Sequence, residues 1–324
     1  MSTNIIETSN TKAVKSAVRR AVKENGMMAV VAEVGSGKTT MFNHLEEYWR
    51  LHSDKIRVVT IKSFDSPRTR IGIIMRLMLE ALNPNIKIPQ SNELIYKLLE
   101  QELRKYTSKN YKIILMIDEA QDLRWKTHRD IKKIHEITGN GMQNLFSVIM
   151  FGKPNKRWSI LYDDPELGHR VETYILDSLN DEDTIKIAKA KYNMRFATDT
   201  VEKRFCSMVR NKTPLGIQFL SNAIKREIGL SLDEIVLITN QLLLKVPTLE
   251  YKTRFKKAGI TQKEFADYCR KVSPSRRYNV QRISEWLNGH LSPEDPISKE
   301  LAILAEEMLS KVLGTKRERI FGVA

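Results

Sequence analysis

The sequence AEVGSGKTT spans residues 32–40 and directly follows the apolar run Met27–Val31. It fits the pattern GxxxxGK(S/T), except that Ala32 stands where the pattern has its first glycine. Glycines in such a loop let successive backbone N–H groups turn inward around phosphate oxygens, and the helix that follows points its positive end at them. Because this stretch lies between an apolar strand and an amphipathic helix, it predicts a phosphate-binding loop.

The side chains of the loop have separate predicted roles. Lys38 neutralises the charge of the β- and γ-phosphates, and Thr39 offers its hydroxyl group to Mg²⁺. The predicted nucleotide-binding residues are Val34, Gly35, Ser36, Gly37, Lys38, Thr39 and Thr40.

An acidic pair, Asp118 and Glu119, follows the apolar run 113–117. A parallel strand delivers both carboxylates to the carboxyl edge of the sheet, where Asp118 can hold the Mg²⁺ shell and Glu119 can polarise the attacking water. Two adjacent acids favour nucleotide hydrolysis over binding alone.

Up to about residue 180, short apolar runs alternate with amphipathic segments, which predicts a parallel α/β sheet. The strands are expected at 27–31, 57–61, 113–117, 147–151 and 173–176. Helical periodicity then predicts an all-helical subdomain and a further helical region. We therefore divide the chain into an α/β core at 1–180, a helical subdomain at 181–247 and a small all-α domain at 248–324.

The chain of 324 residues carries 54 Lys and Arg against 39 Asp and Glu, a net charge of +15, which favours a polyanionic partner. The segment 252–282 alone holds ten basic and two acidic residues. Cys206 and Cys269 form no CxxC pair, so neither a disulfide framework nor a cysteine zinc site is expected. The sequence shows neither a signal peptide nor an apolar run long enough to span a bilayer, so we expect a cytoplasmic protein with no membrane partner.

The basic segment has the layout of a helix-turn-helix. Thr261 and Glu264 form a predicted capping box, a turn follows at 272–275, and Val280, Ile283, Trp286 and Leu287 fall on one face of a second helix. GITQKEFADYC and RISEWLNGHLSP resemble the lambda-repressor-like family, although the linker between the helices is longer here. The resemblance implies DNA contacts by Arg276, Arg277, Asn279, Gln281 and Arg282. A protein-docking helical bundle is the alternative.

The motifs AEVGSGKTT, IILMIDEAQDL, SVIMFGKPN and LGHRVETYILDSLNDED together resemble the AAA+ ATPases, in particular the branch with MuB, TnsC and the ExeA-type ATPases. The resemblance covers about residues 10 to 240. It implies a P-loop AAA+ parallel sheet with a helical lid, ATP and Mg²⁺ as cofactors, and slow, DNA-stimulated hydrolysis.

The resemblance also implies further catalytic residues beside Lys38, Asp118 and Glu119. Lys153 matches the sensor residue at the end of the fourth strand, with an ordinary surface lysine as the alternative. Arg170 matches the arginine that related ATPases supply to the γ-phosphate of a neighbouring subunit, with Arg157 as a second candidate and a structural salt bridge as the alternative. Leu215 stands where the lid usually carries an arginine, which favours an ATP-state switch over lid-driven remodelling.

In the resembled branch, two basic segments line the inner surface of a filament on DNA. Here they correspond to Arg68, Arg70, Lys126, Arg129 and Lys132, with a solvated helix face as the alternative. The implied function is an ATPase that forms a homo-oligomeric filament or ring on double-stranded DNA and serves a transposase as target selector and activator. The alternatives are a helicase loader or replication-initiation ATPase, and an ATP-switched, sequence-specific regulator.

Overall fold

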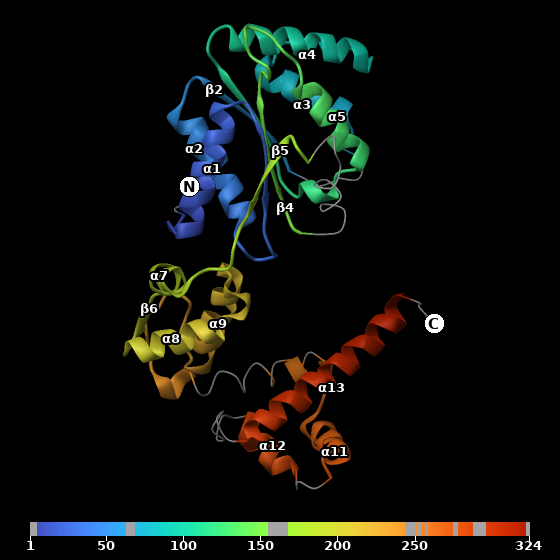
Figure 1. Ribbon diagram of the computed structural model, residues 1–324. Helices are drawn as coiled ribbons and strands as arrows, with labels where there is room; N and C mark the ends of the chain where they lie inside the picture. Colours follow the sequence, from blue (N-terminus) through green and yellow to red (C-terminus); the bar gives the residue numbers. More distant parts are fainter. Residues whose placement is uncertain are drawn as a thin grey trace. The chain divides into compact units, whose positions relative to one another are not determined.

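The computed structural model describes residues 5–62, 69–154, 168–243, 251, 254–256, 258–274, 278–287 and 296–321. The chain divides into two compact units (Figure 1). Unit 1 comprises Met1–Asp183 with Thr213–Leu215, and unit 2 comprises Thr184–Lys212 with Gly216–Ala324.

Unit 1 contains a five-stranded parallel sheet with the order β2-β3-β4-β1-β5. The strands are β1 (Met27–Val31), β2 (Ile56–Ile61), β3 (Lys112–Ile117), β4 (Ser147–Gly152) and β5 (Val171–Ile175). The predicted parallel α/β sheet is confirmed, with strand ends that differ by one or two residues. β5 begins earlier than expected because Val171 already pairs with Met27. All carboxyl ends meet at one edge, which we call the carboxyl edge.

Helices cover both faces of this sheet (Figure 1). On one face lie α1 (Ser9–Lys23) and α2 (Lys38–His52), and on the other lie α3 (Ile71–Leu82), α4 (Asn92–Thr107) and α5 (Trp125–His135). In β1, Met28 and Val30 pack toward the first face, whereas Met27 and Ala29 pack toward the second. A strand buried on both sides needs apolar residues at every position, which explains the continuous apolar run.

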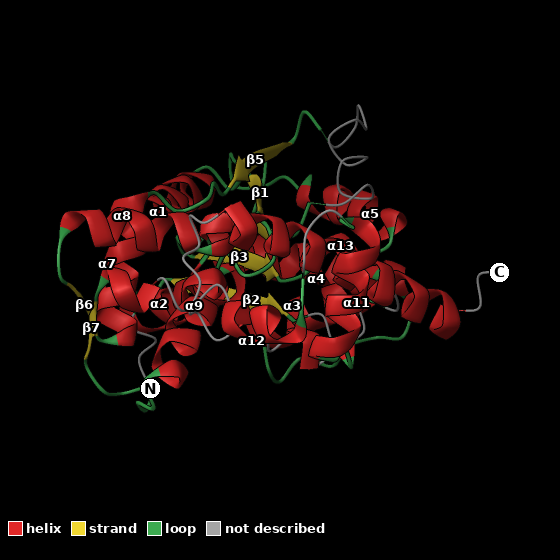
Figure 2. Cartoon of the chain, turned by 90° about the horizontal axis from the view of Figure 1, so that it is seen from below, coloured by secondary structure: helices red, strands yellow, loops and turns green. Residues whose placement is uncertain are grey.

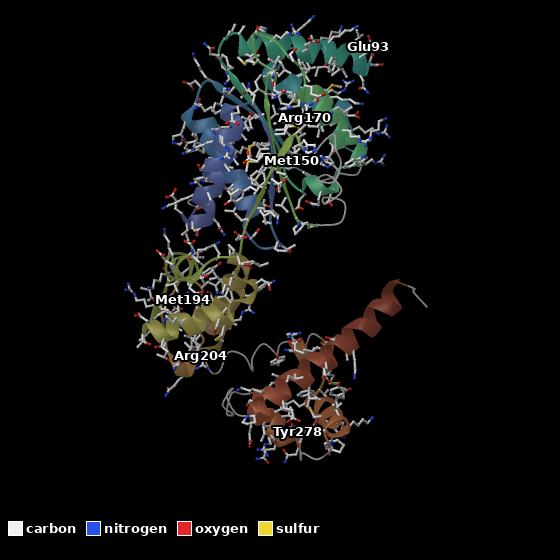
Figure 3. All side chains as sticks on the ribbon, in the orientation of Figure 1. Glu93, Met150, Arg170, Met194, Arg204 and Tyr278 are labelled. Carbon is white, nitrogen blue, oxygen red and sulfur yellow. The ribbon has the colours of Figure 1, made fainter. Side chains whose placement is uncertain are left out.

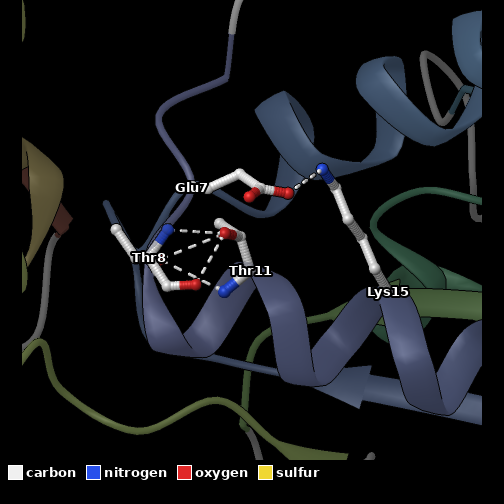
Figure 4. Close-up of polar contacts among 4 residues, drawn as sticks. All are labelled: Glu7, Thr8, Thr11 and Lys15. Carbon is white, nitrogen blue, oxygen red and sulfur yellow. Dashed lines mark hydrogen bonds and ion pairs between the residues drawn. The ribbon is translucent and has the colours of Figure 1, made fainter.

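The start of α1 is fixed by a capping box (Figure 4). The Thr11 backbone N–H donates to Thr8 Oγ1 over 3.1 Å, and the Thr8 N–H donates to Thr11 Oγ1 over 2.8 Å. Lys15 on the next turn pairs with Glu7 at 3.4 Å. The two capping-box bonds satisfy backbone N–H groups that have no partner within the helix.

The helical subdomain includes α7 (Asp181–Tyr192), α8 (Asp199–Met208) and α9 (Pro214–Glu227). The all-helical prediction is wrong in one respect, because β6 (Met194–Phe196) and β7 (Val236–Ile238) form a two-stranded parallel sheet. Each strand has three residues, which is too short to show an alternating pattern in the sequence. Figure 2 marks the strands in yellow and the helices in red.

The C-terminal region contains α11 (Gln262–Val272), α12 (Val280–Leu287) and α13 (Pro296–Phe321). The predicted capping box at Thr261 and Glu264 is present at the start of α11. Phe265, Ile283 and Trp286 lie in one apolar core with residues of α13. Val280 is 41% exposed, so its predicted position on the inner face is wrong: it is the first residue of α12 and lies beyond this core.

Both cysteines are free and buried. Burial raises the pKa of the Cys269 thiol to about 12, so it stays protonated at neutral pH. Among the described residues, we find no helix with the length and apolar character that crossing a bilayer requires.

Candidate active site

The predicted phosphate-binding loop joins β1 to α2 at the carboxyl edge. Gly35 and Gly37 have φ angles of 84° and 93°, in the left-handed region that favours glycine. Gly37 is also the N-cap of α2, and it leaves the first N–H groups of that helix without a side-chain cap. The loop therefore has the backbone geometry of an anion cradle at a helix N-terminus.

Lys38 lies at the head of this loop and is only 7% exposed. Its Nζ donates to the carbonyl oxygens of Ala32 at 2.6 Å and Glu33 at 2.8 Å. Burial lowers the pKa of Lys38, whereas the carboxylates of Glu119 and Asp118 act in the opposite direction. An ammonium group held by two carbonyls can exchange these acceptors for phosphate oxygens.

Asp118 follows β3 and meets Thr39, the second residue of α2. The Thr39 side chain donates a hydrogen bond to the Asp118 carboxylate. Burial raises the pKa of Asp118, and the hydrogen bond from the Glu119 N–H to Asp118 Oδ1, 2.9 Å long, opposes that shift. A buried carboxylate beside a hydroxyl group supplies the oxygen ligands that Mg²⁺ prefers, so this pair fits the predicted metal.

Glu119 has φ 49° and ψ 39°, an unusual conformation for a residue other than glycine. Gln121, which is 1% exposed, holds it from one side. Gln121 Nε2 donates to Glu119 Oε2 at 2.6 Å, and Gln121 Oε1 accepts from the Lys153 N–H at 3.0 Å. Gln121 belongs to the stretch IILMIDEAQDL, but no spacing in the sequence predicts its contact with Glu119 and Lys153.

Lys153 follows β4 at the same edge. It is near enough to Lys38 for its charge to lower the pKa of Lys38. The structure therefore brings together Lys38, Thr39, Asp118, Glu119 and Lys153 from the ends of the neighbouring strands β3 and β4 and the start of α2.

Arg170 lies elsewhere. It directly precedes β5, beside the first residue of β1, and hence at the edge opposite the phosphate-binding loop (Figure 3). Its guanidinium group pairs with Glu136 over 2.9 Å. From this edge it cannot reach the loop of its own chain, so the role toward a neighbouring subunit stays a prediction. Arg157 lies outside the described residues.

Three of the predicted DNA-binding residues share one neighbourhood. Lys126 and Arg129 are exposed on α5, and Arg129 lies over the Trp125 ring at 5.2 Å. Thr127 Oγ1 donates to the Thr69 carbonyl over 3.1 Å, which links α5 to the exposed Arg70. We call Arg70, Lys126 and Arg129 the α5 basic cluster. Lys132 is half-buried and pairs with Glu136 at 3.5 Å, and Arg68 lies outside the described residues.

The predicted contacts of the second helix are partly engaged within the chain. Asn279 Oδ1 accepts from the Arg282 N–H at 2.7 Å and so caps α12. Gln281 Nε2 donates to Glu285 Oε1 at 3.2 Å. Arg276 and Arg277 lie outside the described residues. Tyr278 and Trp286 are 2% exposed, as expected for packing residues (Figure 3 labels Tyr278).

The loop is also in contact with the start of α9. The Leu215 N–H donates to the Gly35 carbonyl at 3.2 Å. A Cβ atom built on Gly35 would lie 2.6 Å from Leu215 Cβ, so the two backbones approach closely. The apolar side chain of Leu215 therefore borders the loop.

A known protein family matches the part of the chain that forms this site. Residues 19–161 match the family described as AAA domain, a range that includes the loop, β1 to β4, Asp118 and Glu119. The fold is that of a P-loop AAA+ ATPase core, followed by a predominantly helical region. No curated protein matches the chain.

Several solved structures are similar over most of the chain. Cdc6p from Pyrobaculum aerophilum is 16% identical, with 92% of this chain and 93% of that chain covered and a TM-score of 0.47. The Aeropyrum pernix ORC1 protein in complex with DNA is 11% identical, with 95% and 85% covered and a TM-score of 0.48. The Thermotoga maritima RuvB Holliday junction branch migration motor is 15% identical, with 86% and 85% covered and a TM-score of 0.45.

Proposed function

We propose that this chain is an ATP-dependent, DNA-binding ATPase that oligomerises on double-stranded DNA and acts as target selector and activator of a transposase. The observation that carries the ATPase part is the convergence of Lys38, Thr39, Asp118 and Glu119 at the carboxyl edge. The remaining parts have separate support, which the next paragraphs give.

The residues at the carboxyl edge have separate roles in ATP hydrolysis. The N–H groups of the loop and the Lys38 ammonium hold the phosphates, and Thr39 with Asp118 would hold Mg²⁺, which neutralises phosphate charge when bound. Glu119 orients and polarises a water molecule, and the Lys153 ammonium adds positive charge beside the phosphates. The buried positions of Lys38 and Asp118 strengthen these electrostatic interactions.

The DNA-binding part rests on charge. The whole chain has a net charge of +15, and Lys126, Arg129 and Arg70 are exposed in one neighbourhood. Exposed Lys and Arg bind phosphates without reading the sequence. The capping role of Asn279 uses one of the polar groups that base reading would need, which favours binding that is independent of sequence.

Assembly and the transposition role have the least direct support. The location of Arg170 at the edge away from its own loop supports a role across a subunit boundary. The transposase partner rests on the resemblance of the four motifs to the MuB, TnsC and ExeA-type branch.

The test compares two double variants with the same change in charge. Lys126→Ala/Arg129→Ala alters the α5 basic cluster, whereas Lys55→Ala/Lys109→Ala removes two exposed lysines from the opposite edge, before β2 and β3. Affinity for two unrelated duplexes is measured by fluorescence anisotropy with ATP over a salt series. Each lost phosphate contact lowers the slope of log K against log salt by about 1.

We expect a slope reduced by about 2 in the cluster variant and an unchanged slope in the control variant. Equal slopes in both variants would show that the α5 basic cluster does not contact the DNA. A strong preference of the wild-type protein for one duplex would favour the sequence-specific regulator instead.

A further inference from the structure

The turn that carries Glu119 is held in a conformation it would not adopt alone. Glu119 is a non-glycine residue with φ 49°, and such a residue keeps a left-handed backbone only where its surroundings fix it. A small movement of those surroundings can therefore change the direction of the Glu119 carboxylate. Gln121 and His128 make the hydrogen bonds that fix the Glu119 carboxylate and the backbone next to it.

Gln121 fixes the carboxylate itself. Its buried amide group bridges Glu119 Oε2 at 2.6 Å and the Lys153 N–H at 3.0 Å. Both polar atoms of the amide are thus hydrogen-bonded, Nε2 to Glu119 and Oε1 to the backbone N–H of Lys153 after β4. The orientation of Glu119 follows the position of Gln121.

His128 fixes the backbone next to Glu119. The ring is 4% exposed on the inner side of α5, and its Nε2 lies 3.0 Å from the Ala120 carbonyl oxygen. Burial lowers the pKa of His128 to about 4, so the ring is neutral at pH 7, and a nitrogen that faces a carbonyl oxygen is the one that carries the proton. His128 Nε2–H therefore donates to Ala120 and ties α5 to the turn.

The outer side of the same helix carries the α5 basic cluster. Lys126 and Arg129 flank His128 in the sequence, and Thr127 bonds to the Thr69 carbonyl beside Arg70. A duplex bound to these cations would contact α5 and the segment before α3 together. The His128 hydrogen bond joins α5 to Ala120, which lies between Glu119 and Gln121, so a displacement of α5 would reach the turn through this bond.

We propose that His128 and Gln121 are positioning residues through which duplex DNA on the α5 basic cluster reorients the Glu119 carboxylate and accelerates hydrolysis. This inference rests on the proposed function, because it needs both ATP hydrolysis and DNA contact at α5. Coupling between two sites typically amounts to about 5- to 150-fold, so the effect is measurable.

The chain offers a matched control for His128. His135 lies on the same helix, is 6% exposed, and also faces a backbone carbonyl oxygen, that of Asn25 at 2.9 Å. Asn25 precedes β1, at the edge away from Glu119. His135 also hydrogen-bonds to the backbone of Phe146. His128→Leu and His135→Leu therefore each remove hydrogen bonds between a buried ring and the backbone, from opposite ends of α5.

The experiment measures kcat and KM for ATP with and without a random-sequence duplex, and duplex affinity with a non-hydrolysable ATP analogue, in the full chain. His128→Leu should bind the duplex with wild-type affinity, and its ratio of kcat with the duplex to kcat without it should fall close to 1. His135→Leu should keep the stimulation, and His128→Gln should retain most of it, because a glutamine amide can still donate to Ala120. Gln121→Met should lower kcat about 10-fold or more without changing KM.

Stimulation of His128→Leu equal to wild type, or equal losses in His128→Leu and His135→Leu, would overturn the inference while leaving the proposed function intact. A wild-type chain that binds the duplex without any rise in kcat would overturn it as well. A wild-type chain that does not bind the duplex would overturn the proposed function, and the inference with it.

Discussion

Replacing Gly35 with alanine tests how closely the phosphate-binding loop is held against the start of α9. At φ 84°, an alanine destabilises the folded state by about 1–2 kcal/mol of backbone strain. Alanine also lowers the conformational entropy of the unfolded chain, which offsets about 0.4–1 kcal/mol of this strain. The new Cβ atom would also lie 2.6 Å from Leu215 Cβ and 2.9 Å from Leu215 Cδ2. Overpacking of this kind costs about 1–3 kcal/mol, so we expect a total loss of roughly 2–4 kcal/mol.

Gly141→Ala is the matched control, because Gly141 has φ 75° in the same unit and no atom within 4 Å of the built Cβ. We expect Gly141→Ala to lower the free energy of unfolding by about 1 kcal/mol, through backbone strain alone. Amide hydrogen exchange of β1 and β4 in the full chain measures the opening free energy of unit 1. Leu215→Gly should relieve most of the additional cost of Gly35→Ala, since it removes the atoms that overlap. Equal costs of Gly35→Ala and Gly141→Ala would refute the close approach of Leu215.

Three further predictions concern separate residues. Lys38→Ala should abolish ATP binding in calorimetric titration, since it removes the ammonium at the head of the loop, and wild-type affinity would contradict the site. Arg170→Ala mixed with Lys38→Ala should regain some hydrolysis, because an intact loop can meet an intact arginine; without any rescue, Arg170 is only the partner of Glu136. Folding lowers the pKa of His128 from 6.5 to about 4. The neutral ring therefore contributes fully to the free energy of unfolding above pH 6.5, and this contribution is lost as the pH falls. At pH 4 the free energy of unfolding is lower by about 3 kcal/mol for this reason. Denaturant unfolding at pH 7 and pH 4 should show a smaller acid loss in His128→Leu than in wild type.

The parts of this fold that local sequence determines were predictable. Met27–Val31 is apolar at every position because helices cover both faces of β1, and the glycines at 35 and 37 have the left-handed conformation that the loop requires. Asp118 and Glu119 follow from the apolar strand before them, since parallel strands deliver their carboxyl ends to one edge.

The parts that depend on distant contacts were not predictable. The role of Gln121 arises from partners on two elements, Glu119 after β3 and Lys153 after β4, and no spacing in the sequence marks that meeting. β6 and β7 are three residues each and are brought together by the fold around them. Val280 matches the apolar face by periodicity, yet at the first position of α12 it lies beyond the core.

The central claim is that the loop and the acidic pair form one ATP-hydrolysing site in which Glu119 activates water. Single-turnover hydrolysis of prebound, labelled ATP measures this directly, because substrate binding is complete before the reaction starts. Glu119→Gln keeps the size of the side chain and can still bond to Gln121, but it cannot accept a proton from water. We predict that Glu119→Gln hydrolyses prebound ATP about 100- to 10,000-fold more slowly than wild type. Hydrolysis at the wild-type rate would contradict the account.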